Sequence, residues 1–196
     1  MKSIKIKYKI PGCFFTIIVM CAGCSAALTE SKPDKLSKKI YKEVIKNNKF
    51  QYTRNDTVYS YKKMEDYILE EKHSTGCRLI TIVAYNKHER FIIGNGQKFS
   101  DMLLGVFKKF DSNGKVIEET NYNKDFAFDF DRFIKKAKNE LGLDLNDEKY
   151  IVLRYVDEGI PAYFIRYEYN INGFKFIKID GTNGNIIFNK FVPRTE

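Results

Sequence analysis

The chain has 196 residues, of which 43% are hydrophobic and 30% are charged, and its formal net charge is +9. The length fits one domain or two small ones, and 13 tyrosines with 16 phenylalanines exclude a disordered chain. The composition also excludes collagen, a coiled coil and a membrane protein with many spans.

Residues 1–23 have the pattern of a secretory signal peptide. Four lysines and no acidic residue lie in residues 1–10, and an apolar run follows from Cys13 to Gly23. A positive segment, an apolar segment of about 7–15 residues and small residues before the cut define such a peptide. A transmembrane anchor needs about 20 consecutive apolar residues, and Pro11-Gly12 interrupts this run. A signal peptide is therefore favoured over an anchor.

The end of this segment, Cys21-Ala22-Gly23-Cys24, resembles a bacterial lipobox. The resemblance implies cleavage between Gly23 and Cys24, and acylation of Cys24 as the first residue of the mature chain. Several acyl chains hold a protein stably at a membrane, whereas one short chain binds only marginally. The open alternative is that signal peptidase cuts nearby and releases a soluble protein.

Removal of the signal peptide changes the meaning of the charge. The leader takes four lysines with it, which leaves 30 basic and 25 acidic residues and a net charge of +5. The mature chain would lie outside the cytoplasm, so we expect no nucleic-acid partner. Residues 24–35 are polar with one proline, as expected of a flexible tether. Cys77 is the only thiol left if Cys24 carries lipid, and we expect it to be a packing residue.

The N-terminal region, residues 36–125, combines helical and strand patterns. Its first helix is predicted from apolar residues at helical spacing, namely Leu36, Ile40, Tyr41, Val44 and Ile45. A weaker helical pattern covers Tyr61–Lys72. Strands are predicted from β-branched and aromatic runs at Leu79–Tyr85, Arg90–Ile93, Leu104–Phe110 and Val116–Tyr122. Asn113-Gly114 predicts a hairpin between the last two strands.

The C-terminal region, residues 126–196, repeats this order more clearly. A helix is predicted from the apolar face formed by Phe130, Phe133, Ile134, Ala137 and Leu141. Asp129 is placed to cap its start and Gly142 to end it. Four strands follow, at Tyr150–Val156, Ala162–Tyr169, Phe174–Ile179 and Ile186–Phe191.

One helix followed by a four-strand meander predicts an α+β fold, with the helix packed on an antiparallel four-stranded sheet. The turn sequences at residues 110–117 and 179–187 are similar and lie at matching places in the two regions. This similarity suggests two tandem units of one helix and four strands each.

The C-terminal region also resembles a PepSY domain. The residues that carry the resemblance are Phe133–Gly142, Pro161–Ile165, Phe176–Asp180 and Asn183–Ile187. The resemblance implies a small extracytoplasmic α+β module, of PepSY or cystatin-like kind, that binds and in some relatives inhibits peptidases or other envelope proteins. It identifies no partner.

The sequence predicts no catalytic or metal-binding constellation and no cofactor. Its two histidines, His73 and His88, lie on charged stretches, where surface residues are expected. The acidic residues near 125–131 surround a predicted helix start, where carboxylates interact favourably with the helix dipole. Those near 144–148 lie in a predicted turn, where aspartates hydrogen-bond to the backbone.

A row of tyrosines on one strand is a candidate binding face. Tyr163, Tyr167 and Tyr169 share one side of the strand, and exposed tyrosines give amphipathic contact area at low entropic cost. The alternative is that the row packs beneath the helix as core, and this alternative is favoured.

The function expected from these patterns is that of a lipid-anchored protein of the bacterial envelope. It would act without catalysis, as a protein-binding or inhibitory module of the peptidase-inhibitor or immunity-protein type. Its partners would be a membrane, through the lipid, and another envelope or secreted protein. The alternative function is an envelope enzyme whose carboxylates come together only in the fold.

Overall fold

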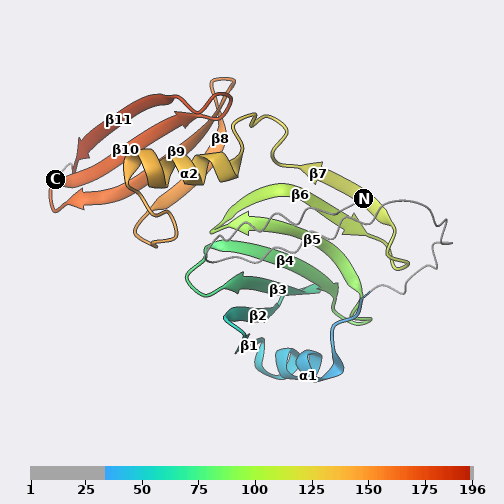
Figure 1. Ribbon diagram of the computed structural model, residues 1–196. Coiled ribbons are helices and arrows are strands. Elements are labelled where there is room, and N and C mark those ends of the chain that lie inside the picture. Colours follow the sequence, from blue (N-terminus) through green and yellow to red (C-terminus); the bar gives the residue numbers. More distant parts are fainter. Residues whose placement is uncertain (1–33, 195–196) are drawn as a thin grey trace, which may run out of the picture. The chain divides into compact units, whose positions relative to one another are not determined.

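The computed structural model describes residues 34–194, which belong to one compact unit (Figure 1). Two helices and eleven strands are formed within this range. The helices are α1 (Lys38–Asn47) and α2 (Phe130–Leu141). The strands are β1 (Lys49–Arg54), β2 (Thr57–Lys63), β3 (Tyr67–Ser74), β4 (Leu79–Asn86), β5 (Ile92–Phe99), β6 (Met102–Phe110), β7 (Val116–Asn121), β8 (Ile151–Asp157), β9 (Ile160–Asn170), β10 (Gly173–Asp180) and β11 (Ile186–Pro193).

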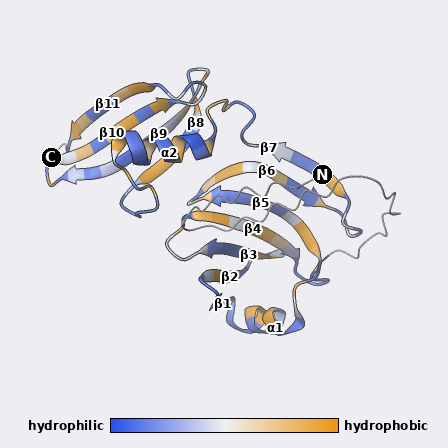
Figure 2. Ribbon diagram, viewed as in Figure 1, coloured by the Kyte–Doolittle hydropathy of each residue, from blue (hydrophilic) through white to orange (hydrophobic). Residues whose placement is uncertain are grey.

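The first seven strands form one antiparallel sheet in which each strand pairs with the next along the chain. Hydrophilic and hydrophobic residues alternate along its ribbons, as they do in the second sheet (Figure 2). The helix α1 begins at Ser37, whose hydroxyl oxygen accepts a hydrogen bond from the Ile40 amide. Val44 of this helix is fully buried in a cluster with Tyr61, Ile68 and Tyr85 of the sheet.

The last four strands form a second antiparallel sheet in the order β11-β10-β9-β8. The helix α2 begins at Asp129, whose carboxylate accepts from the Arg132 amide at 2.8 Å, and ends at Gly142, which has φ +69°. Phe133 of α2 stacks on Tyr163 of β9, with 4.2 Å between ring centroids. Both side chains are fully buried, so the apolar face of α2 forms a core with this sheet.

This core also includes residues from the first sheet. Phe99 at the end of β5 lies 5.0 Å from Phe130, measured between ring centroids. Met102 and Leu104 of β6 are buried in the same cluster. The end of the β5–β6 hairpin therefore contributes side chains to the core beneath α2.

The predicted fold class is wrong for the chain. Residues 34–194 are mostly antiparallel β structure, in a seven-stranded and a four-stranded sheet, with only two short helices in this range, and do not form a helix-on-four-strand α+β fold. The seven strands of the first sheet also differ in number from the four of a tandem unit. The physical reason is that the segment before residue 79, where a helical pattern was predicted, forms the three further strands β1, β2 and β3 of one continuous meander.

The predicted helix at Tyr61–Lys72 is a second error. These residues form the end of β2, a turn and most of β3. Ile68 is buried next to Tyr61 and Tyr85 because all three lie on the same face of the sheet. The strand β1 was also not predicted. The turn that joins it to β2 is Asn55-Asp56. Both turn residues have positive φ, as a two-residue hairpin turn requires.

The predicted signal peptide, the lipobox with Cys24 and most of the predicted tether lie outside the described residues. Within residues 34–194, neither helix has the length and apolar character needed to cross a membrane.

Candidate functional site

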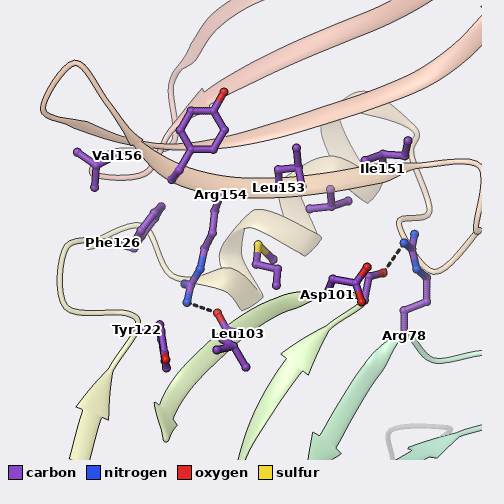
Figure 3. Close-up of a pocket in the computed structure, with 13 residues that line it drawn as sticks. Arg78, Asp101, Leu103, Tyr122, Phe126, Ile151, Leu153, Arg154 and Val156 are labelled. Carbon is purple, nitrogen blue, oxygen red and sulfur yellow. Dashed lines mark hydrogen bonds between the residues drawn. The ribbon is translucent and has the colours of Figure 1, made fainter.

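A cleft of about 700 Å³ runs along β8, with β6 on its other side (Figure 3). All six residues from Ile151 to Val156 line it, and Met102 and Leu103 of β6 face them. Successive side chains of a strand point to opposite faces of its sheet. A cleft that touches six consecutive residues therefore follows the edge of β8.

The backbone of β8 has hydrogen-bonding groups on this edge. The hairpin that joins β8 to β9 has a two-residue loop, and Asp157 pairs with Ile160 on either side of it. In such a hairpin the flanking pair exchanges hydrogen bonds and bonded pairs then alternate. Leu153 and Tyr155 therefore bond to β9, whereas the peptide groups of Val152, Arg154 and Val156 point away from it.

Pro161 confirms this register independently. It lies opposite Val156, has no N–H to donate, and its carbonyl oxygen accepts from the Gly181 amide at 2.7 Å. Among the described residues, the outward-pointing peptide groups of β8 make no backbone hydrogen bond to another element. The edge of β8 therefore pairs with no other strand among the described residues. Because Val152 is only 3% exposed, the accessible part of this edge is at Arg154 and Val156.

The other three sheet edges carry features that discourage strand pairing. The edge strand β7 bears Glu118 and Glu119, which form ion pairs with lysines of β6. The edge strand β1 begins with a lysine and ends with an arginine, and β11 contains Lys190, ends in a proline and has an irregular register. Charges, prolines and bulges on edges are the usual protection against unwanted pairing.

The strand β8 has neither a proline nor a register irregularity. Its register with β9 is regular, and its one lysine or arginine is Arg154. Ile151, Leu153, Tyr155 and Val156 are all large hydrophobic residues that are 41–50% exposed. A regular edge strand with exposed apolar side chains is a template for pairing with another chain.

The side chain of Arg154 extends from β8 across the cleft to Leu103 of β6 (Figure 3). One of its terminal nitrogens donates to the Leu103 carbonyl oxygen at 2.6 Å and the other to the Asn123 side-chain oxygen at 2.7 Å. The guanidinium lies over the Phe126 ring, 4.8 Å from its centroid. All these partners are neutral, and within the described part of the chain Arg154 forms no ion pair. Its burial lowers the pKa of the guanidinium, in the direction expected for a cation held without a counter-charge.

Arg78 closes the other end of the cleft. Its guanidinium donates to three backbone carbonyl oxygens in the segment between α2 and β8, those of Leu145, Asp147 and Tyr150, at 2.7–3.1 Å. It also donates to the Ser100 hydroxyl (Figure 3). Asp101 follows that serine and lines the same end of the cleft. Among the described residues that line the cleft, the one carboxylate, that of Asp101, is therefore at the Arg78 end.

The predicted tyrosine row divides between core and surface. Tyr163 is fully buried, and its hydroxyl donates to the Phe128 carbonyl oxygen at 3.0 Å. Burial raises the pKa of this hydroxyl to about 12. Tyr167 packs against Tyr150 at 5.2 Å between ring centroids, and Tyr169 is 60% exposed. The three side chains therefore do not form one exposed face.

Acidic residues that the sequence analysis considered form hydrogen bonds with nearby backbone amides. Asp129 caps α2, while the carboxylates of Asp144 and Asp147 accept from backbone amides two residues ahead. His88 is exposed, and a ring nitrogen of His73 lies 3.1 Å from the Ser74 carbonyl oxygen. Within residues 34–194 no group of three or more metal-ligating side chains comes together. Cys77 is a free, half-buried thiol.

No family model, no curated protein and no solved structure matches this chain. Its function is therefore inferred from the cleft itself. Sequence reasoning missed β8 as a functional element, although the apolar residues on both sides of Arg154 were visible in the sequence.

Proposed function

We propose that this protein is a lipid-anchored envelope protein that acts by binding another protein, without catalysing a reaction. In this proposal the binding surface is the cleft along β8. A segment of the partner, itself an envelope or secreted protein, adds to the four-stranded sheet as a fifth strand. Lipid on Cys24 keeps the binding surface at the membrane.

The observation that carries the proposal is the cleft that runs along the regular edge of β8. Strand addition needs free backbone donors and acceptors for affinity, and pockets beside them for specificity. The outward peptide groups of Arg154 and Val156 supply the first. The cleft supplies the second.

Site-specific photo-crosslinking tests this proposal. A photoreactive amino acid replaces Leu153 in full-length protein, produced in the cells that naturally make it, and adducts are identified by mass spectrometry. The matched control places the same amino acid at Ile117, which is 64% exposed on the edge strand β7. We expect one discrete protein adduct from position 153 and none from position 117.

A second substitution separates specific binding from chance capture. Val156→Pro removes an outward N–H from β8 at a half-exposed position, and edge strands tolerate proline. The adduct at position 153 should disappear in this variant. An adduct that persists with Val156→Pro, or that forms equally at position 117, contradicts the proposal.

A further inference from the structure

The side chains of β8 determine which residues would lie beside an added strand on each face of the sheet. On the face toward α2, a partner strand would lie beside Val152, Arg154 and Val156. On the opposite face it would lie beside Leu153 and Tyr155, since residues opposite each other in paired strands share a face. Arg154 is thus the one charged residue of β8 in contact with the middle of the segment, and its neighbours on both faces are apolar.

The guanidinium of Arg154 is prepared to receive an anion. Two of its five N–H groups are committed to Leu103 and Asn123, which fix its position together with the Phe126 ring. The remaining donors have no carboxylate partner among the described residues. A fixed guanidinium binds a carboxylate with strong, charge-assisted hydrogen bonds and without further loss of side-chain entropy.

We infer that the segment recognised by β8 carries an acidic side chain opposite Arg154, flanked on both sides by apolar residues. This inference depends on the proposed function, because it names the chemistry of the partner at that same site. The acidic residue accepts hydrogen bonds from the guanidinium, and the apolar residues cover the exposed side chains of β8.

The same chemistry disfavours a second copy of this chain as the occupant. Arg154 is the central residue of the seven in β8. Two copies paired antiparallel about their centres would therefore place Arg154 directly opposite the same arginine of the second copy. Like charges directly opposite in a sheet are destabilising, so Arg154 works against self-association and in favour of an acidic segment.

A random library of displayed nine-residue peptides tests the inference on the full chain. Binders are selected on the wild-type protein and counter-selected on the variants Val156→Pro and Leu153→Lys, in which the edge is blocked or charged. We expect enriched peptides with one aspartate or glutamate between apolar residues. Replacing that acid by its amide should weaken binding about tenfold or more, the range of a charge-assisted hydrogen bond.

The variant Arg154→Gln assigns this preference to the arginine. In Arg154→Gln the acidic peptide and its amide analogue should bind equally, and in Arg154→Lys the preference should survive in weaker form. The unfolding midpoint of each variant is measured as a control for stability, because Arg154 also donates a hydrogen bond to the Leu103 carbonyl oxygen. A second readout needs only wild-type protein. Raising the salt concentration from roughly 50 to 500 mM should weaken binding of the acidic peptide more than binding of its amide analogue, because salt screens the attraction between charges.

The outcomes separate the two proposals. Peptides that depend on an open β8 edge but show no acidic preference overturn this inference and leave the proposed function standing. A preference that persists in Arg154→Gln, or shows no dependence on salt, also overturns the inference. Failure to enrich any peptide on wild type over the blocked variants overturns the proposed function and the inference together.

Discussion

At the scale of single residues, Tyr163 links the core to a measurable pH dependence. Its hydroxyl is buried, with a hydrogen bond to Phe128, and its pKa is raised from 10.0 to about 12. The native state therefore holds this proton more tightly than the unfolded state does. The resulting stability is fully present below pH 10 and is lost as the pH rises from 10 to 12.

Between pH 10 and pH 12 the free energy of unfolding of Tyr163→Phe should fall by about 3 kcal/mol less than that of the wild type. Each unit of pKa shift corresponds to about 1.4 kcal/mol. The free energy of unfolding is measured in urea at a series of pH values. Burial also raises the pKa of Tyr61 and Tyr85, so part of the decline remains in the variant. Tyr169→Phe, an exposed control, should decline like the wild type, and equal declines in all three proteins contradict the assignment.

Two glycines with the same backbone conformation separate strain from packing. Gly184 and Gly159 both have φ +81°. A Cβ added at Gly184 would lie 2.5 Å from the Phe128 ring, whereas a Cβ at Gly159 would meet no atom within 4 Å. Gly159→Ala should therefore cost only the strain of the left-handed conformation, about 1–2 kcal/mol. Gly184→Ala should cost about 1–3 kcal/mol more, because the ring must move. Urea unfolding of both variants measures the difference, and equal losses would show that Phe128 yields without cost.

At the scale of elements, local patterns predicted the structure where one face is strongly apolar. The helix α2 lies where the spacing of Phe130, Phe133 and Ala137 placed it, with Asp129 and Gly142 at its ends. The four C-terminal strands lie close to their predicted ranges. These elements have side chains that alternate or repeat with one clear period, so a single sequence is sufficient to place them.

Other elements depend on partners that are distant in sequence. Met64, Ile68 and Leu69 fit a helical spacing, yet Ile68 is buried because neighbouring strands bring Tyr61 and Tyr85 to its face. The strand β5 continues through Gly94 and Gly96, which a local pattern reads as a break. A Cβ at Gly96 would lie 2.6 Å from the Phe107 ring, so the glycines are required by close packing with β6. Such tertiary reasons are absent from any short window of sequence.

The candidate site was hidden for the same reason. The sequence from Ile151 to Asp157 identifies a strand, but whether a strand lies at an edge depends on the order of the whole sheet. Likewise, the neutral partners of Arg154 come from residues 31 and 51 positions away in the chain. The sequence instead indicated the row of Tyr163, Tyr167 and Tyr169 as a candidate binding face, but Tyr163 is buried beneath α2.

At the scale of the whole molecule, the proposed membrane anchor places the cleft where envelope partners are found. Cys24→Ala should release the protein from the membrane fraction and remove the mass of the acyl chains, because several acyl chains are needed for stable anchoring. Cell fractionation and intact-protein mass spectrometry measure both effects, with Cys77→Ala as the control that keeps both. Membrane association without any acyl mass in the wild type contradicts a lipid anchor.

Binding and anchoring are separable in this account. The Cys24→Ala variant should keep its affinity for a selected peptide, because the cleft is built from residues 78–156 of the described unit. The edge variant Val156→Pro should stay in the membrane fraction while losing that affinity.

The central claim is that the edge of β8 is open and pairs with a strand of the partner. Amide hydrogen exchange, followed residue by residue by NMR, tests it most directly. In the free protein we expect the amides of Arg154 and Val156 to exchange rapidly, while those of Leu153 and Tyr155, bonded to β9, are protected. Binding of a selected peptide should protect the amides of Arg154 and Val156. Protection of these two amides in the free protein, or no change when the peptide binds, would contradict the account.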